Sequence, residues 1–231
     1  MCGRFSFHSP HETVVQLFGV AGGAGGAAAV PPRWNIAPSA TVVAVRATAG
    51  GQRELALLHW GLVPSWAKER SIGERLINAR VETLREKPAF RSAFRKRRCL
   101  VVADGYYEWR AVGAQKQPYL IAAANGAPFG MAALWETWAD PAGGAPLESC
   151  VIVTRESAGV VRDIHARMPA IVAPDDYAAW LDPASADVAA LETLLTGEPR
   201  VALVAHPVSR RVNNPRNEGP ELAVPSAAGS G

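Results

Sequence analysis

Cys99-Leu100-Val101-Val102-Ala103, Asp104-Gly105 and Tyr106-Tyr107-Glu108-Trp109 make up the stretch that decides the fold of this chain. An apolar run, a glycine turn and an aromatic run follow one another, and this order predicts two short strands joined by a turn. Apolar runs of the same kind recur, with turn signals between them, at 41–47, 54–60, 119–124, 129–135 and 150–154. Many short strands at close spacing predict an α+β protein: a single domain with a curved, barrel-like, mostly antiparallel β core and peripheral helices.

A few helices and two further strands are expected around this core. Ser9-Pro10-His11-Glu12 is typical of a helix start, with Ser9 as N-cap and Glu12 as its capping-box partner, and Gly19 is expected to end the helix. The other expected elements are a short helix opening at Pro88, helices at 175–181 and 187–195, and strands at 170–173 and 201–204. The domain is predicted to span 1–222, with an Ala/Gly-rich surface loop at 21–29 and a disordered tail at 223–231.

The composition limits the classes to which the protein can belong. The chain has 231 residues, 48% of them hydrophobic and 19% charged, with a net charge of +3, which are ordinary globular values. Its three cysteines are far apart and form no C-x-x-C pair, so neither a disulfide framework nor a zinc site is predicted. No apolar run approaches the ~18 residues of a membrane-spanning helix, and the N-terminus lacks a signal-peptide pattern. We therefore expect a cytoplasmic monomer without a membrane or metal partner.

Met1-Cys2-Gly3-Arg4 offers an unusual nucleophile. Cys2 is small enough for Met1 to be trimmed, which would leave Cys2 with an α-amine and a thiol on adjacent carbons. Reference pKa values of about 7.7–8.0 for the amine and about 8.5 for the thiol leave both groups partly nucleophilic near neutral pH. The amine can condense with an aldehyde to an imine, and the thiol can then close on the imine carbon to give a thiazolidine. The alternative is that Cys2 is an incidental residue at a frayed end.

Glu108 is a carboxylate inside an aromatic strand. Desolvation in a buried strand would raise its pKa toward the range that is useful for proton transfer. The alternative is that strand alternation points Glu108 to water while Tyr107 and Trp109 face the core.

His165 and Arg167 stand two residues apart, just before a proline that keeps the segment extended. In an extended segment both side chains project to the same face, and the guanidinium disfavours the charged imidazole, which suits a proton shuttle. The alternative is a histidine bonded to a backbone group in a turn. The remaining histidines lack convincing partners, so a metal site is not expected.

Asn78-Ala79-Arg80-Val81-Glu82 places an amide, a cation and a carboxylate on alternate residues. Asn78 could hold a carbonyl or hydroxyl, and Arg80 could take a phosphate or pair with Glu82 in a surface salt bridge. The segment 85–98 holds seven basic residues against one acid, and with tryptophans nearby this composition is typical of a single-strand binder. A solvated helix face is the alternative explanation of the charge run.

Taken together, these stretches resemble one family, the SRAP proteins, named SOS-response-associated peptidases. The matching motifs are Met1–Phe5, Trp34–Pro38, Trp60–Trp66, Asn78–Thr83, Ala103–Trp109 and Ile164–Pro169, and His206–Ser209 and Val212–Asn214 extend the match. With these extensions the match covers nearly the whole chain. Six ordered motifs, the first fixed at the N-terminus, argue against a chance match.

The resemblance implies a protein that senses abasic sites in single-stranded DNA and forms a thiazolidine DNA–protein crosslink through Cys2. Such a crosslink would shield the lesion during replication or repair, as part of the SOS response to DNA damage. By position, Asn78 would orient the opened deoxyribose, while Glu108 and His165 would transfer protons in crosslink formation and reversal. No metal or organic cofactor is implied, and the DNA-bound protein would be associated with the nucleoid.

The resemblance also implies a set of DNA contacts. Matching positions are Arg4, Arg80 and Arg167 for backbone phosphates, Pro38 and Trp66 for the wedge that meets the bases, and Thr154 for another contact. Arg155 is expected to add a phosphate contact. Ala67 stands where some members of the family have a second tryptophan, which leaves the extent of base stacking open.

Two other functions stay open. The protein could be a cysteine peptidase acting on its own N-terminus or on other proteins, because Cys2, Glu108 and His165 could run acyl transfer. Lyase-type and autopeptidase activities could also accompany the crosslinking. Alternatively, the protein could be a non-catalytic binder of single strands or junctions through the segment 85–98 and Trp66, with an affinity that falls steeply with salt.

Overall fold

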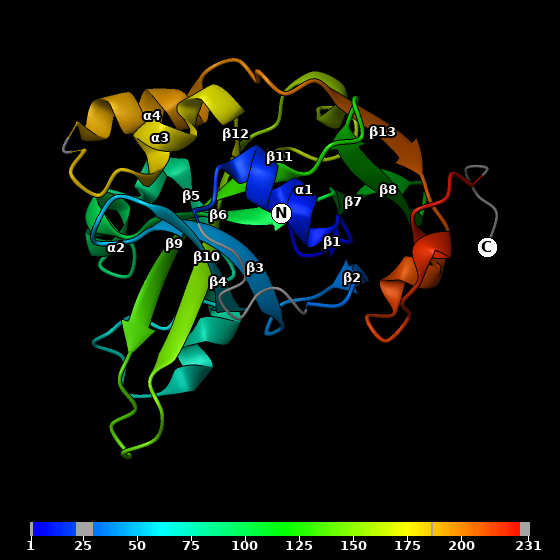
Figure 1. Cartoon of the computed structure of the whole chain (residues 1–231). Coiled ribbons are helices and arrows are strands. Elements are labelled where there is room, and N and C mark those ends of the chain that lie inside the picture. The colour runs from blue at the N-terminus through cyan, green and yellow to red at the C-terminus, as the bar shows by residue number, and fades with distance from the viewer. Residues whose placement is uncertain (1, 22–29, 186, 227–231) are drawn as a thin grey trace.

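Among the residues that the computed structural model describes, which are 2–21, 30–185 and 187–226, five strands close into a barrel. They are β3 (Thr41–Ala47), β4 (Arg53–Trp60), β6 (Arg98–Ala103), β9 (Phe129–Trp138) and β10 (Leu147–Glu156). The strands pair in the order β10-β4-β3-β6-β9, and β9 pairs with β10 to complete the ring (Figure 1). All of these pairings are antiparallel except the parallel one between β10 and β4. The predicted α+β fold with a barrel-like, mostly antiparallel core is confirmed.

Three short strands extend the barrel. β5 (Asn78–Arg80) runs parallel to β10, and β11 (Arg167–Pro169) runs antiparallel to it. β12 (Ile171–Val172) pairs with β9. The pairings of β5 and β11 meet at Thr154 of β10, so residues from two distant parts of the sequence are brought to the same end of one strand.

A second, fully antiparallel sheet lies beside the barrel. Its strand order is β13-β8-β7-β1-β2. The strands are β1 (Phe5–Phe7), β2 (Arg33–Ile36), β7 (Gly105–Val112), β8 (Gln115–Ala123) and β13 (Leu203–Pro207). The N-terminal strand β1 is held between β7 and β2, so the chain start is built into the sheet.

Short helices pack around the two sheets. The α-helices are α1 (His11–Phe18), α2 (Arg91–Lys96), α3 (Tyr177–Leu181) and α4 (Val188–Thr196). The 3-10 helices are η2 (Arg70–Arg75), η3 (Val81–Thr83), η4 (Gly159–Val161), η5 (Pro174–Asp176), η6 (Arg210–Asn213) and η7 (Pro220–Leu222). α3 and α4 lie together at one end of the molecule, as Figure 1 shows. Within the described residues, no helix is long and apolar enough to cross a membrane.

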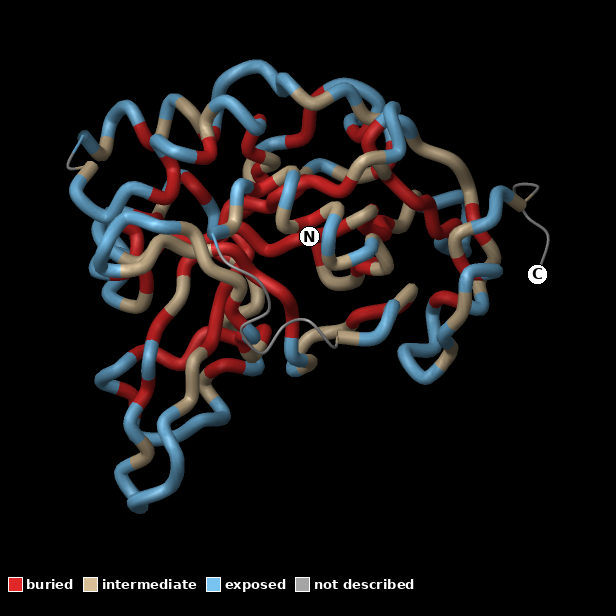
Figure 2. Tube along the Cα trace, in the orientation of Figure 1, coloured by how far each residue is buried: buried red, intermediate tan, exposed pale blue. Residues whose placement is uncertain are grey.

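One apolar core joins the barrel to the second sheet. The rings of Phe5 on β1 and Trp60 on β4, both fully buried, have centroids 5.2 Å apart. Tyr106 on β7 meets Phe129 on β9 edge-on, with centroids 6.5 Å apart. The buried residues, red in Figure 2, lie in both sheets and in the space between them. Burial of this apolar surface on both sides of the junction fixes one sheet against the other.

The predicted capping box of the first helix is wrong. α1 begins at His11 behind Pro10 and has no side-chain cap. The Ser9 hydroxyl and the Ser9 N–H both donate to the carboxylate of Asp104, which lies in the turn between β6 and β7. The hydroxyl of Ser9 therefore bonds to Asp104, which is distant in sequence, and does not accept a hydrogen bond from the first N–H groups of α1. The predicted end at Gly19 is confirmed, because this glycine adopts the left-handed conformation with φ of 62°.

The chain remains packed beyond residue 222. Pro225 forms a bridge with Val208, and the N–H of Ser226 donates to the carbonyl of Pro207 at 2.9 Å. The predicted disordered tail is therefore wrong for residues 223–226. The rest of that tail, 227–231, and residues 22–29 of the predicted surface loop lie outside the described residues.

Candidate active site

Cys2 and Asn78 meet where the two sheets adjoin. Cys2 precedes β1 of the second sheet, and Asn78 opens β5 on the barrel. The Asn78 side-chain amide donates to the Cys2 carbonyl at 2.7 Å, which fixes the start of the chain against the barrel. The other amide atom, Asn78 Oδ1, is buried and has no hydrogen-bond partner among the described residues. A buried acceptor of this kind is costly to leave unpaired, so it is available to a donor that enters the site.

Glu108 and His165 form the second pair of the site. Glu108 on β7 is only 2% exposed, and its Oε1 lies 3.9 Å from Nδ1 of His165. Burial raises the pKa of Glu108, and the nearby imidazole partly offsets this. His165 is half-buried, and its Nδ1 lies 3.0 Å from both the backbone N and the backbone O of Arg167. The expected backbone hydrogen bond of His165 is therefore present, and the same ring nitrogen faces the Glu108 carboxylate. The role of His165 in proton transfer stays a prediction.

Glu108 is buried although strand alternation offered the alternative of a solvent-facing side chain. On the opposite face of β7, Tyr107 is also fully buried, packs with Val208 and Val212, and donates its hydroxyl to the Trp34 carbonyl at 2.8 Å. The sheet is thus covered on both faces: by the barrel on one and by the C-terminal segment on the other. Alternation alone cannot identify the solvent side of such a strand.

Tyr106 is a further member of this site, outside the predicted set of site residues. It lies two residues before Glu108, so both side chains project from the same face of β7. Its hydroxyl is buried without a hydrogen-bond partner among the described residues, and its pKa is raised by burial and by nearby Cys2 and Glu108. The i, i+2 spacing from Glu108 was the available sequence signal.

The Cys2 side chain is fully buried at this junction. Burial raises the pKa of its thiol, and the negative charge of Glu108 raises it further. The thiol is therefore protonated in this environment and needs a base when it reacts. An open groove lined by Glu108, Trp109, Lys116, His165 and Asn213 leads from the site to solvent. Within the described part of the chain, no cluster of three or more His, Cys, Asp or Glu side chains could hold a metal ion.

The residues expected to contact phosphates have different environments. Arg80 is exposed on β5. Arg4 is half-buried and donates to Asn35 Oδ1 and to the Val212 carbonyl, both at 2.8 Å, so it ties the chain start to the C-terminal segment. Arg167 makes a two-pronged ion pair with Glu82, at 2.6 and 3.0 Å. The spacing in the sequence suggested Arg80 as the salt-bridge partner of Glu82. In the structure Glu82 pairs with Arg167 instead.

Thr154 does not face the surface in this structure. Its side chain is fully buried in β10, and its hydroxyl lies 3.4 Å from the Ala79 carbonyl. The β5 and β11 strands pair with β10 on both sides of this position and cover it. The Thr154 side chain is therefore not exposed to solvent in this structure, and its expected DNA contact stays a prediction.

Pro38 and Trp66, the two expected wedge residues, leave the barrel at one end. Pro38 lies in the turn before β3, and Trp66 lies in the loop after β4. Thr41 pairs with His59, so the start of β3 and the end of β4 are neighbours. Trp66 is 59% exposed, which is unusual for so large an apolar side chain.

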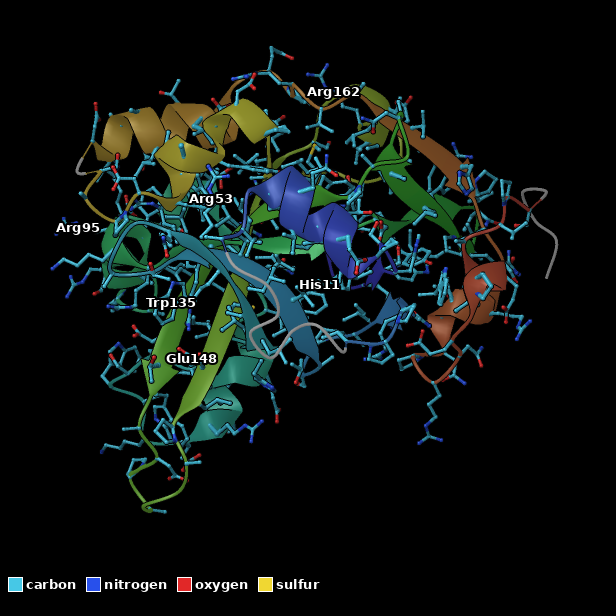
Figure 3. The ribbon with its side chains drawn as sticks, in the orientation of Figure 1. His11, Arg53, Arg95, Trp135, Glu148 and Arg162 are labelled. Carbon is cyan, nitrogen blue, oxygen red and sulfur yellow. The ribbon has the colours of Figure 1, made fainter. Side chains whose placement is uncertain are left out.

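The basic segment 85–98 is largely structural at its C-terminal end. The Arg98 side chain is only 3% exposed and donates to the carbonyls of Phe94 at 2.8 Å and Trp180 at 2.6 Å. Arg97 pairs with Glu136 at 2.7 Å. Arg95, in contrast, points outward from α2 (Figure 3). The hypothesis of a binder that acts through this basic run is therefore weakened.

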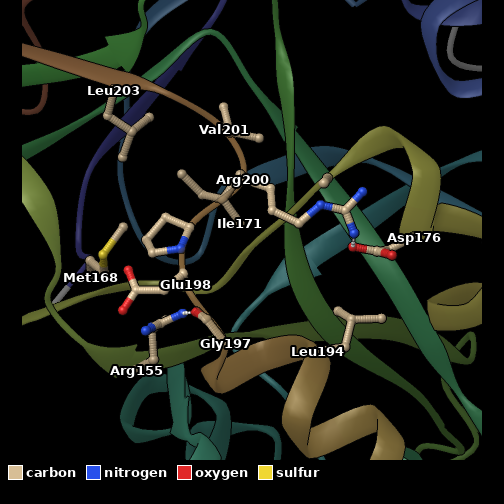
Figure 4. Close-up of a pocket in the computed structure, with 12 residues that line it drawn as sticks. Arg155, Met168, Ile171, Asp176, Leu194, Gly197, Glu198, Arg200, Val201 and Leu203 are labelled. Atoms are coloured by element: carbon tan, nitrogen blue, oxygen red, sulfur yellow. Dashed lines mark hydrogen bonds and ion pairs between the residues drawn. The ribbon is translucent and has the colours of Figure 1, made fainter.

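Arg155 also serves the fold. Its guanidinium donates to the carbonyls of Leu195, at 3.2 Å, and Gly197, at the C-terminal end of α4 (Figure 4). Cations at this position complement the unpaired carbonyls of a helix end. The Arg155 side chain is directed to the helix end in this structure, and its expected phosphate contact stays a prediction.

Comparison with known proteins finds relatives over most of the chain. A family model described as SOS response associated peptidase (SRAP) matches residues 1–215. The Bacillus subtilis protein named abasic site processing protein YoqW is 37% identical over 228 residues, which cover 96% of this chain and 98% of that protein. The Xenopus tropicalis protein named abasic site processing protein HMCES is 36% identical over 192 residues, covering 74% of this chain and 57% of that protein.

Solved structures share the fold as well. A Bacteroides thetaiotaomicron protein superposes with a TM-score of 0.86 at 25% identity, covering 98% of this chain and 100% of that one. A phage-related protein of Bordetella bronchiseptica gives a TM-score of 0.70 at 30% identity, covering 90% of this chain and 95% of that one.

Proposed function

The chain belongs to the SOS response associated peptidase (SRAP) family, and from this membership we propose that it processes abasic sites in single-stranded DNA by linking itself covalently to them. Its relatives in B. subtilis and X. tropicalis carry the name abasic site processing protein. The observation that supports the proposal best is the convergence of Cys2, Asn78 and Glu108 at the junction of the two sheets. An abasic sugar in equilibrium with its open aldehyde is the electrophile that an N-terminal aminothiol traps.

The first step of the proposed reaction is imine formation. After removal of Met1, the α-amine of Cys2 attacks C1′ of the ring-opened deoxyribose. The nitrogen passes one proton to the former aldehyde oxygen and keeps the other, so a protonated imine remains when this oxygen leaves as water. Glu108 can supply the proton for this departure, because its burial raises its pKa and keeps a fraction of the carboxyl protonated. Glu108 is left as a carboxylate.

The second step is ring closure. The Cys2 sulfur bonds to C1′, and the π electrons of the protonated imine become a lone pair on nitrogen, which keeps its proton. Since burial holds the thiol protonated, the Glu108 carboxylate formed in the first step is the base that accepts the thiol proton, and Glu108 returns to its acid form. The product ring contains sulfur, two cysteine carbons, nitrogen and C1′, and the net loss is water. No oxidation occurs.

Asn78 and His165 have supporting roles in this proposal. Asn78 holds the Cys2 carbonyl and presents its buried, unpaired Oδ1 to a hydroxyl of the opened sugar. His165 adjusts the charge of Glu108 from 3.9 Å and lines the groove through which the DNA strand would enter. Arg80 and Lys116, both exposed, would contact phosphates on the way to the site.

A denaturing gel tests the proposal. Wild-type protein is mixed with a single-stranded oligonucleotide that carries one abasic site, and we expect a heat-stable shifted band. Cys2→Ala should give no band. Cys150→Ala, which removes a buried thiol from the barrel, is the matched control and should react like the wild type.

The outcome also separates this function from peptidase activity. A chain that is confirmed by mass to begin at Cys2 and still forms no adduct would overturn the proposal. A Glu108→Gln chain that retains Met1, beside a wild type that loses it in the same host, would instead support self-processing of the N-terminus.

A further inference from the structure

The loop that carries Trp66 is fixed at its base. This Trp66 loop, residues 61–76, connects β4 to β5. The Leu62 N–H donates to the Leu76 carbonyl at 3.1 Å, and so closes the loop. The backbones of Gly61 and Gly73 touch, since a Cβ on Gly73 would lie 2.6 Å from the Gly61 carbonyl oxygen. Gly61 has φ of 141°, a conformation that favours glycine. Backbone contacts therefore help to fix the shape of the base.

The tip of the Trp66 loop is held by a residue from a distant strand. The indole N–H of Trp138, near the end of β9, donates to the Ala67 carbonyl at 2.7 Å. Ala67 and Trp138 are 6% and 5% exposed and pack with Val63, Ile72 and Leu147 in a small cluster separate from the main core. Trp66, directly beside Ala67, is left pointing into solvent.

Trp138 lies on a hairpin arm, residues 136–149, formed by the outer parts of β9 and β10 and their turn. Figure 1 shows this arm projecting from the barrel beside the teal segment that contains η2 of the Trp66 loop. Trp138 pairs with Leu147 across the arm, and the Ser149 hydroxyl accepts a hydrogen bond from the Val63 N–H at 2.9 Å. The arm thus contacts the Trp66 loop both near its base and at its tip.

We propose that Trp138 is a positioning residue that holds Trp66 ready to stack on a base beside the abasic site. The inference rests on the proposed function. A large exposed indole on an unrestrained loop would fold back on apolar surface, and ordering it again would weaken DNA binding. The hydrogen bond from Trp138 to Ala67 prevents this by fixing the backbone next to Trp66. Trp138 belongs to none of the motifs that carry the family resemblance.

Trp138→Phe tests the proposal because it keeps an aromatic ring and removes the N–H donor. We expect the affinity for an unmodified single-stranded oligonucleotide, measured by fluorescence anisotropy, to fall about fivefold, as for loss of one hydrogen bond. The half-saturating DNA concentration for crosslinking should rise by the same factor, while the rate at saturating DNA stays unchanged. Reaction of Cys2 with glyoxylate, an aldehyde without a base, should also stay unchanged. Trp135→Phe, on the same strand but packed on Arg46, is the matched control.

A double-mutant cycle distinguishes positioning from a general structural role. If Trp138 acts through Trp66, Trp138→Phe should cause no further loss of affinity in a Trp66→Ala background. Ile72→Ala loosens the same cluster from the loop side and should repeat the effect if Trp138→Phe fails to fold. Wild-type affinity of Trp138→Phe, or losses that add in the double variant, would overturn the inference. A wild type that forms no adduct but shows the coupling in anisotropy would contradict the proposed function alone.

Discussion

At the scale of single residues, burial of Glu108 lowers the stability of the folded protein at neutral pH and suits this carboxyl to proton transfer. Folding moves this carboxyl from water, where a glutamate pKa is about 4.3, into a site where burial raises the pKa. Between these two values the folded state keeps a proton that the unfolded state has lost. Wild-type stability therefore falls as pH rises through this window. The amide that Glu108→Gln introduces does not titrate, so this variant should be more stable than wild type at neutral pH and lose the advantage below about pH 4.

Urea unfolding of both proteins at several pH values measures this difference. The same variant should form the crosslink roughly 10²–10⁴-fold more slowly, which is the range for loss of a general acid–base group. Glu156→Gln, an exposed change of the same kind, serves as the control for net charge. A Glu108→Gln protein less stable than wild type at neutral pH would contradict the desolvation argument.

Glu82 is a second residue with an important charge, because we expect this charge to limit DNA binding by Arg167. Hydrogen bonds from Arg167 lower the pKa of Glu82, so the pair stays ionised, and Glu82 occupies the guanidinium face that a phosphate would use. Glu82→Gln should free Arg167 for DNA. We expect tighter binding of single strands and a salt dependence steeper by about 0.7 in log–log slope, as for one added phosphate contact.

Anisotropy titrations over a range of salt concentrations measure this slope. Glu86→Gln removes the same charge from an exposed residue nearby and controls for the change in net charge. Equal effects of the two variants would show that Arg167 gains no phosphate contact when Glu82 is neutralised.

At the scale of elements, Arg98 joins two helices to the barrel. Its guanidinium lies between the C-terminal ends of α2 and α3 and donates to carbonyls of both, including Trp180 at 2.6 Å. Arg98→Met should destabilise the protein by about 3 kcal/mol, because buried carbonyls lose charged donors worth roughly 1.5–3 kcal/mol each. Arg95→Ala, on the exposed face of α2, should stay within about 0.5 kcal/mol of wild type.

Chemical denaturation measures both variants, and single-strand affinity measured beside it tests the remaining role of the basic run. If Arg98→Met lowered the affinity for single strands under conditions in which the variant is still fully folded, the segment 85–98 would have to be regarded as a DNA-binding surface.

Local pattern predicts the strands of this protein well. The apolar run at 41–47 coincides with β3, and the other predicted core strands match β4, β6, β7, β8, β9 and β10 within a few residues. These runs are bounded by Gly and polar turns, so their limits are encoded locally. The capping box failed because the partner of Ser9 is Asp104, which is distant in sequence. A local sequence pattern contains no information about a hydrogen-bond partner that lies so far away in the sequence.

The candidate site was predictable only in part. Family motifs mark Cys2, Asn78, Glu108 and His165, and the structure brings Cys2 to Asn78 and Glu108 to His165. The role of Arg155 and the burial of Thr154 depend on strand pairing and on α4, which no local window contains. Trp138 has no local signal either, because its partner Ala67 lies on another element.

At the scale of the whole molecule, the site exists only where the two sheets are packed together. Cys2 precedes β1 and Glu108 lies on β7, both strands of the second sheet. Asn78 lies on β5 and His165 precedes β11, and both of these strands pair with β10 of the barrel. The same boundary is crossed by buried rings, such as Phe5 against Trp60. Separation of the sheets would therefore expose apolar core and disassemble the site in a single event.

This architecture predicts one cooperative unfolding transition, although the chain is longer than most two-state domains. Urea curves followed by far-UV circular dichroism, by tryptophan fluorescence and by crosslinking after brief dilution into abasic oligonucleotide should share one midpoint. Phe5→Ala removes the ring that contacts Trp60 across the boundary, and we expect a loss of about 3–5 kcal/mol. All three curves should shift together in this variant. A crosslinking curve that falls at lower urea than the dichroism curve would show that the second sheet detaches while the barrel stays folded, and that the junction is the weakest part of the molecule.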